Sequence, residues 1–197
     1  MKYKLIPTKE IRPLEMVFPH HLKNLTEMIY RDKAIRFPLI VERDYNIVLD
    51  GSHRYIFLLQ DGYELAPVLY VDYDDPNVRV GTSRLHRMLV KDKVMISKKE
   101  VIRRGVSGDL FPPRTTRHFF PFLRPEINVS LNKLRKTKEI DVSSFIVNVN
   151  IEEEIKHNRK YIEEIEEETD ELIRYLEESR RTKKYLQNQI RRMEIEK

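Results

Sequence analysis

A short turn between an apolar strand and an apolar helix carries the residues best suited to chemistry. It lies in VLDGSHRYIFL, residues 48–58, where small and polar residues interrupt the apolar ones. The residues that would hold an anion follow one another: Gly51, Ser52, His53 and Arg54. A helix N-terminus offers unpaired amides and a partial positive charge to a phosphate, and a glycine lets the backbone approach it closely. We expect a phosphate-binding turn, although a capping Ser52 and a buried His53 would also explain the pattern.

Asp50 precedes this turn at the end of the expected strand. Its carboxylate is a hard oxygen ligand of the kind that Mg²⁺ prefers, and Mg²⁺ commonly joins one protein carboxylate to the phosphates of a nucleotide. We therefore expect Asp50 to bind Mg²⁺ beside the phosphates. The alternative is that Asp50 only closes the turn.

A second group of polar side chains stands in the segment GDLFPPRTTRHFFPFLRP, residues 108–125. Its prolines exclude a regular helix or a central strand, so we expect a loop. Four consecutive donors occur in it: Thr115, Thr116, Arg117 and His118. Because side chains alternate along an extended backbone, Thr116 and His118 should face one way and the other two the opposite way. Loops often carry function, so we expect substrate binding here; the alternative is a loop that merely covers the core.

The elements that position these residues are indicated by apolar spacing. Strands are expected at 3–7, 37–42, 46–49 and 66–73, and helices at 19–30 and 52–60. Between 78 and 94 the pattern suggests a strand at 78–83 and a short helix at 83–90. A capping box at 97–100 then opens a helix that ends at Gly105 or Gly108.

The chain from Ile151 onward predicts one long helix with a heptad seam. The seam positions are Ile155, Asn158, Ile162, Ile165, Thr169, Leu172, Leu176, Ser179, Lys183, Leu186, Ile190 and Met193. The first half is mostly Glu and the second half is richer in Arg and Lys, so the charges would match if two copies ran antiparallel. We expect a homo-oligomer through this helix, or else a helix that packs along its own domain.

The composition of the 197 residues limits the class of protein. The absence of cysteine excludes disulfides, thiolate metal sites and a cysteine nucleophile. No apolar run of about 18 residues and no signal-peptide core are present, so we expect a cytoplasmic protein without a membrane segment. Charged residues make up 35% of the chain, which leans toward a thermophilic source.

The net charge of +5 is unevenly distributed along the chain. Residues 151–197 hold 11 basic and 14 acidic residues, a net charge of −3, which leaves about +8 for residues 1–150. The front of the protein should therefore attract anions, either nucleotide phosphates or a nucleic-acid backbone.

Several motifs together resemble the ParB/sulfiredoxin fold. They are IRPL at 11–14, FPLIV at 37–41 and VLDGSHRYIFL followed by APVLYVDY, and the G-x-H-R-Y turn is the most specific. The resemblance covers residues 3–75 and implies an α+β, ParB/sulfiredoxin-like domain, here with a long C-terminal helix that could form a coiled coil. We expect a nucleotide-binding core at 1–80, a substrate-side subdomain at 81–147 and a helical tail at 148–197.

Three chemistries compete within that superfamily. Sulfiredoxins carry a catalytic cysteine where this chain has Ser52, which excludes their reductase chemistry. ParB proteins continue into a helix-turn-helix, and ISKKEVIRRG resembles one basic helix of it, but FPPRTTRHFFPF breaks the pattern where further helices are required. Free L-serine kinases are similar over residues 3–125, including SKKEVIRRG and GDLFPPRTTRH.

The kinase resemblance implies phosphoryl transfer from ADP or ATP to the hydroxyl of free L-serine, giving O-phosphoserine with Mg²⁺ as cofactor. It implies that Glu15, in IRPLEMV, orients the serine hydroxyl or accepts its proton, with Glu10 as the alternative. Asp50 and His53 would also act in catalysis, Asp50 on the metal and the hydroxyl, His53 on the transferring group. The alternatives are a ParB-like nucleotide-dependent DNA-binding protein or nuclease, and an inactive or regulatory descendant.

One departure from the kinase pattern concerns the segment before the capped helix. Serine kinases of this type tend to carry an aromatic residue there, often tryptophan, and this chain has no Trp. Ser83, Arg84 and His86 stand in that segment instead. Under the kinase resemblance we therefore expect the acceptor to be serine with a rearranged pocket or another small hydroxy compound.

Overall fold

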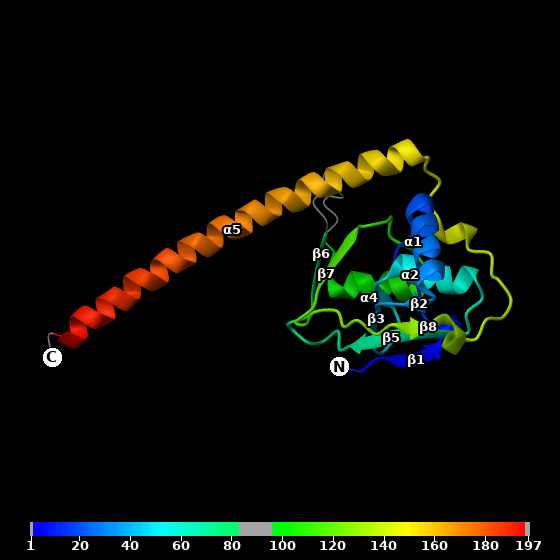
Figure 1. Cartoon of the computed structure of the whole chain (residues 1–197), viewed down its shortest axis with the longest axis horizontal. Coiled ribbons are helices and arrows are strands. Elements are labelled where there is room, and N and C mark those ends of the chain that lie inside the picture. Colours follow the sequence, from blue (N-terminus) through cyan, green and yellow to red (C-terminus); the bar gives the residue numbers. More distant parts are fainter. Residues whose placement is uncertain (1, 83–95, 196–197) are drawn as a thin grey trace. The chain divides into compact units, whose positions relative to one another are not determined.

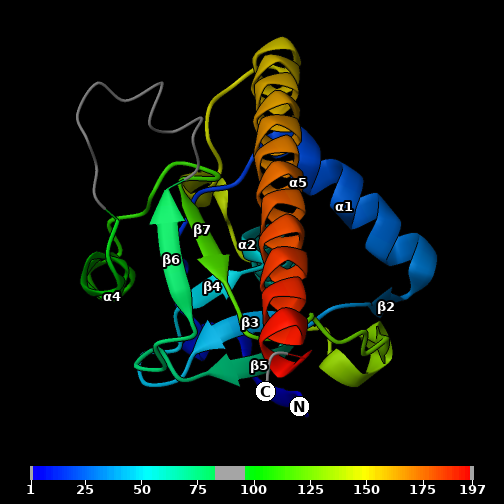
Figure 2. The same ribbon diagram turned by 90° about the vertical axis from the view of Figure 1, so that its left-hand side faces the viewer.

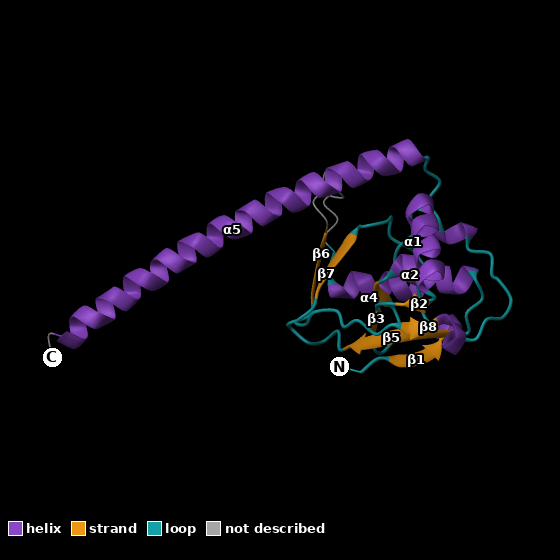
Figure 3. Cartoon of the chain, viewed as in Figure 1, coloured by secondary structure: helices purple, strands orange, loops and turns teal. Residues whose placement is uncertain are grey.

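The structure is a computed structural model that describes residues 2–82 and 96–195. It divides into two units, Met1–Glu154 and Ile155–Lys197 (Figures 1 and 3). The expected short helix at 83–90, with Ser83, Arg84 and His86, lies outside the described residues.

The elements follow one another in a mixed α and β order. The strands are β1 Lys4–Pro7, β2 Ala34–Ile35, β3 Leu39–Glu42, β4 Val48–Asp50, β5 Leu65–Val71, β6 Arg79–Thr82, β7 Thr116–Phe119 and β8 Val129–Ser130. The α-helices are α1 Pro19–Asp32, α2 Ser52–Gln60, α4 Lys98–Ser107 and α5 Ile151–Ile195. Short 3₁₀ turns are η1 Thr8–Glu10, η2 Leu131–Leu134 and η3 Ser143–Phe145.

The main sheet has four strands in the order β1-β5-β3-β4. β3 and β5 run parallel (Figure 2). β1 pairs with β5 and β4 pairs with β3 in antiparallel fashion. β2 with β8 and β6 with β7 form two small two-stranded ribbons. Because β4 is at one edge and leads directly into α2, the residues after Asp50 emerge at the end of the sheet.

Both faces of the sheet are covered by apolar residues. Leu39 and Val41 of β3 pack into a core with α1 and α2, whereas Ile40 packs into a second core with Phe111 and with Val101 of α4. Successive side chains of a strand point to opposite faces, so a fully buried β3 supplies both cores. This double burial holds the ends of β3 and β4, and with them the candidate site, in a fixed place.

The second unit is the greater part of α5. The N-terminus of α5, which belongs to the first unit, is set by a reciprocal capping box. The Glu153 amide donates to Asn150 Oδ1 at 2.9 Å, and the Asn150 amide donates to Glu153 Oε2 at 3.1 Å. Most of the expected seam side chains along α5 are exposed, including Leu172 and Leu176. The long helix from Ile151 is therefore confirmed, and its self-association stays a prediction.

Most expected elements are confirmed, with two corrections. The loop expected over 108–125 contains β7, which is no central strand but an edge partner of β6. Ser52 does not cap α2, because Gly51 is the N-cap and Ser52 is the first helical residue. Of the two proposed helix ends, Gly108 is the C-cap of α4, whereas Gly105 lies inside the helix against Ile47. The capping box is confirmed in that Ser97 Oγ accepts from the Glu100 amide.

Candidate active site

The turn after β4 depends on glycine at position 51. Gly51 has φ 101°, a left-handed value that other residues rarely adopt. A Cβ added there would lie 2.7 Å from Arg54 Nη2 and 2.9 Å from Leu39 Cδ2. Both the backbone angle and the crowding therefore require glycine, and the turn presents the first amides of α2 without a side-chain cap.

Asp50 lies under two guanidinium groups. Its Oδ2 is 3.1 Å from Arg54 Nη2 and 2.9 Å from Arg124 Nη1. Arg54 also donates to the Pro38 carbonyl at 3.2 Å, and its buried Nε has no hydrogen-bond partner within the described residues. Asp50 therefore orients the guanidinium groups of Arg54 and Arg124 beside the glycine turn, and Arg54 Nε remains available as a hydrogen-bond donor among the described residues.

His53 faces the start of α1. Its Nε2 accepts a hydrogen bond from the Phe18 amide at 3.2 Å, and its ring stacks on that of His21 with centroids 4.2 Å apart. Burial, followed by the nearby His21 and Arg114, lowers the pKa of His53 to about 3. The ring is thus neutral at pH 7, and because Nε2 is an acceptor, Nδ1 carries the proton.

Glu15 lies across from β7. Its Oε1 accepts hydrogen bonds from the amide and the hydroxyl of Thr116, at 2.6 and 2.7 Å. Burial raises the pKa of Glu15 to about 7, against the opposing effect of the Thr116 hydrogen bonds, and the Asp50 charge adds to the rise. A carboxyl group that titrates near neutrality is suited to general acid or base work.

The backbone around Glu15 is held by Phe111. Glu15 and Phe111 form a parallel bridge in which the Phe111 amide donates to Leu14 O and the Met16 amide donates to Phe111 O, both at 2.9 Å. The Arg104 guanidinium lies over the Phe111 ring, 4.2 Å from its centroid. The end of α4 is therefore packed against the residue that positions Glu15.

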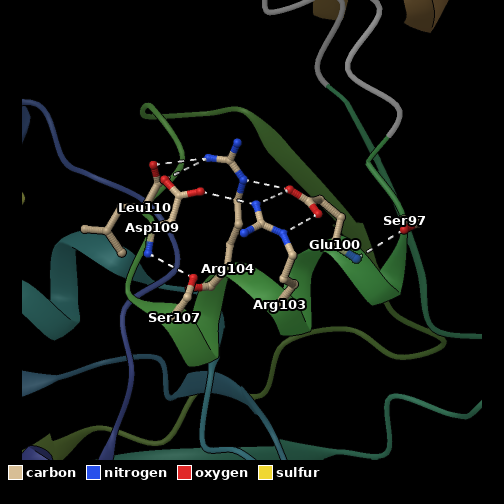
Figure 4. Close-up of polar contacts among 7 residues, drawn as sticks. All are labelled: Ser97, Glu100, Arg103, Arg104, Ser107, Asp109 and Leu110. Atoms are coloured by element: carbon tan, nitrogen blue, oxygen red, sulfur yellow. Dashed lines mark hydrogen bonds and ion pairs between the residues drawn. The ribbon is translucent and has the colours of Figure 1, made fainter.

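A polar network fixes that end of α4 (Figure 4). Glu100 Oε1 lies 2.7 Å from Arg103 Nη2 and 2.8 Å from Arg104 Nε. Arg103 Nη2 also reaches Asp109 Oδ2 at 3.2 Å. Exposed ion pairs of this kind contribute little stability singly, but the shared carboxylate fixes the orientation of Arg104 over Phe111.

The four expected donors, of which Thr115 directly precedes β7, separate as alternation requires. Thr116 contacts Glu15, and His118 Nε2 lies 2.9 Å from the hydroxyl of Tyr73. Arg117 lies over the ring of Phe119, and Thr115 is fully buried. Burial lowers the pKa of His118 to about 4, against the opposing charge of Asp50. Thr116 and His118 therefore face the acids Glu15 and Asp50.

The fit of Mg²⁺ rests on Asp50. Among the described residues, no group of three or more acidic, His or Cys side chains could hold a metal ion on its own. Within the part of the chain that the structure describes, the polar contacts of the Asp50 side chain use Oδ2, which leaves Oδ1 as a hard oxygen ligand. One carboxylate together with donor phosphates is a common way to bind Mg²⁺, so these residues fit the ion when a nucleotide is present.

Several residues of the site had no signal in the sequence. Arg124 and Arg114 stand in a segment already noted, but their partners, Asp50 and the ring of Phe18, lie far away along the chain. Tyr73 and His21 likewise meet His118 and His53 only in the fold. A charge between prolines, as at Arg124, is the one hint that the sequence offered.

In sequence, the chain is 34% identical over 82 residues to the ATP-dependent L-serine kinase of Staphylothermus marinus, covering 40% of this chain and 32% of that protein. It is 28% identical over 103 residues to a ParB-like protein of Sulfolobus acidocaldarius, covering 52% and 50%. The chain thus matches half or less of the length of these curated relatives. No family model matches the chain.

Solved structures of free serine kinases share the fold. One in complex with AMP has a TM-score of 0.59 at 18% identity, covering 68% of this chain and 94% of that chain. A mutant form in complex with ADP has a TM-score of 0.59 at 17% identity, covering 68% and 95%. The chain therefore has an α+β, ParB/sulfiredoxin-like fold with a long C-terminal helix, and it is similar in sequence to an L-serine kinase and to a ParB-like protein.

Proposed function

We propose that this protein is a phosphotransferase that moves a phosphoryl group from ADP or ATP to the hydroxyl of free L-serine. The observation that carries the proposal is Glu15, a carboxyl group with a pKa of about 7 held by Thr116 and electrostatically coupled to Asp50. The similarity to the L-serine kinase of Staphylothermus marinus and the shared fold support it. A phosphoryl-transfer site needs positioning, charge neutralisation and a group that handles the acceptor proton.

The donor phosphates would bind at the glycine turn. Gly51 and Ser52 contribute backbone amides at the start of α2, and Arg54 keeps a buried Nε that a phosphate oxygen would satisfy. Arg124 adds a second cation, and His53 offers its Nδ1–H as a neutral donor. Mg²⁺, when bound through Asp50 and the phosphates, would neutralise charge on the transferring group.

The acceptor would lie beside the pair that Glu15 forms with Thr116 of β7. The serine hydroxyl attacks the terminal phosphorus, its proton passes to Glu15, and the bond to the leaving nucleotide oxygen breaks. The products are O-phosphoserine and AMP when ADP is the donor, or O-phosphoserine and ADP when ATP is the donor. Thr116 contacts Glu15 and His118 lies near the charge of Asp50, whereas Thr115 is fully buried. Arg117, on the alternate face beside Phe119, is the donor least suited to serine.

The proposal is tested by incubating the protein with L-serine, Mg²⁺ and either ADP or ATP, and detecting O-phosphoserine by phosphorus NMR. L-Threonine and glycerate in place of serine test other small hydroxy acceptors. Formation of O-phosphoserine with one donor supports the proposal and identifies that donor. Its absence with both donors refutes it.

A ParB-like, nucleotide-dependent DNA-binding protein is the second candidate. It is favoured by the 28% identity to the ParB-like protein of Sulfolobus acidocaldarius. Against it, the chain after α4 forms the edge strand β7 rather than a second helix, so the described residues there form no helix-turn-helix. Tight binding to one DNA sequence at physiological salt would favour this candidate over the kinase.

Self-association through α5 belongs to the same proposal. The seam residues expose their apolar side chains, and the acidic first half would lie against the basic second half of an antiparallel partner. No helix among the described residues is long and apolar enough to cross a membrane. We infer a second copy of this chain as the partner of α5.

A further inference from the structure

The N-terminus of α1 binds a carboxylate from a distant part of the chain. The amides of His20 and His21 donate to Glu154, at 3.0 Å to Oε2 and 2.8 Å to Oε1. Glu154 is only 3% exposed. A buried carboxylate requires charge-assisted hydrogen bonds, and the N-terminus of a helix favours negative charge. Glu154 therefore satisfies amides that α1 would otherwise leave unpaired.

The chain around Glu154 is fixed on both sides. The capping box of Asn150 and Glu153 sets the first turn of α5. Just before it, the Val17 amide donates to Phe145 O at 2.8 Å and the Val147 amide donates to Val17 O at 3.1 Å. Val17 follows Glu15 by two residues, so the same short segment carries the candidate base and is hydrogen-bonded to the residues that precede α5.

The start of α1 is also a wall of the candidate site. His53 accepts a hydrogen bond from the Phe18 amide, and its ring stacks on that of His21. The His21 amide in turn donates a hydrogen bond to Glu154. If the first turn of α1 moved, the Phe18 amide that donates to His53 Nε2 and the stacked ring of His21 would move with it.

We propose that Glu154 is a positioning residue of the candidate active site. Its carboxylate fixes the first turn of α1, and through Phe18 and His21 it keeps His53 in the orientation and tautomer that present Nδ1–H as a donor. The first turn of α5 thereby belongs to the catalytic unit, separate from the seam that follows. This inference deepens the proposed function and rests on it for the effect on turnover.

The test uses full-length protein with Glu154→Gln and Glu154→Ala, and Glu152→Gln as the matched control. Glu152 is exposed in the same turn of α5, so its substitution removes the same charge without touching α1. We expect Glu154→Ala to bind nucleotide about 10-fold more weakly, as for the loss of a hydrogen bond to a charged group, and Glu154→Gln to lie between it and the parent. The KM for nucleotide should rise more than kcat falls.

A second measurement is independent of turnover. The ring-proton NMR signals of His53 should shift in both Glu154 variants and stay unchanged in Glu152→Gln. The inference would be overturned if both Glu154 variants had the nucleotide affinity and the His53 signals of the parent. If Glu154→Ala does not fold, the same two measurements on Glu154→Gln decide the question. A parent that makes no O-phosphoserine would refute the proposed function alone, because the His53 signals still test Glu154.

Discussion

Glu15 illustrates how one residue balances function against stability. Its folded pKa of about 7 lies above the 4.5 of an unperturbed glutamate. The group therefore contributes to stability below about pH 4.5, and that contribution is lost as the pH rises through about 7, where the buried site must accept a charge. The same rise supplies the carboxylate that a general base needs. An acid at this position is thus most costly to the fold at the pH where it would be active.

The pH dependence of the reaction follows from this pKa. Only the ionised form of Glu15 accepts the serine proton, so kcat/KM should rise about tenfold per pH unit below about 7 and level off above it. A pH series of initial rates measures this. A profile without a break between pH 6 and 8 would show that Glu15 is not the titrating group.

Removing the charge of Glu15 should raise the free energy of unfolding, although it should lower activity. Glu15→Gln is expected to be more stable than the parent at pH 8, because the amide needs no ionisation in a buried site, and the difference should vanish near pH 4, below the pKa of about 4.5 in the unfolded chain. Urea unfolding at both pH values measures it. Equal stability of parent and variant at pH 8 would contradict the raised pKa.

Asp50→Asn separates metal binding from the positioning of cations. If Asp50 binds Mg²⁺, the variant should lose about tenfold or more in nucleotide affinity with Mg²⁺ and little of it in EDTA. If Asp50 acts only by orienting Arg54 and Arg124, the nucleotide affinity should fall by the same factor with Mg²⁺ and in EDTA. Calorimetric titration with ADP or ATP distinguishes them, and unchanged binding in both conditions would remove Asp50 from the site.

At the scale of elements, the glycine turn joins β4 to α2. Gly51→Ala should lower the free energy of unfolding by about 1–3 kcal/mol, because the added Cβ meets Arg54 and Leu39 at a strained backbone angle. Gly108→Ala is the matched control. It also has a positive φ, but a Cβ there would have no neighbour within 4 Å, so its cost should be about 1 kcal/mol. Equal costs in urea unfolding would show that crowding at Gly51 is unimportant.

The periodic elements were predictable from the sequence, whereas the side-chain partners were not. Apolar spacing located α1, α2 and α5, because a buried face repeats along one element. β7 was missed since a proline-rich segment gives no strand signal until its partner β6 is known. The resemblance pointed to Glu15 and Asp50, yet the contacts of Glu15 with Thr116 and of Asp50 with Arg124 join residues 101 and 74 positions apart in the chain. Such long-range pairs leave no local pattern.

At the scale of the whole molecule, α5 presents an apolar seam that a second copy would cover. Replacing Leu172 and Leu176 with Asp should convert the oligomer into a monomer, because charges would be buried in the seam. Glu178→Ala, outside the seam, should leave the mass unchanged. Light scattering measures both, and an unchanged mass in the seam variant, or a monomeric parent, would refute association through α5.

The positive excess of residues 1–150 bears on nucleic-acid binding. Any binding to DNA should be weak, independent of sequence and lost as salt is raised, because the charge attracts phosphates without a complete reading motif among the described residues. Filter binding across a salt series with two unrelated duplexes measures this. A strong preference for one duplex at high salt would contradict it.

The most direct measurement of the central claim compares parent and Glu15→Gln in O-phosphoserine formation, beside calorimetric titration with the nucleotide donor. The parent should convert L-serine with Mg²⁺ and ADP or ATP. In the variant, turnover should fall by about 100-fold or more, the order expected for losing general-base help, with nucleotide affinity retained. A variant with full activity, or a parent that forms no O-phosphoserine with either donor, would contradict the account.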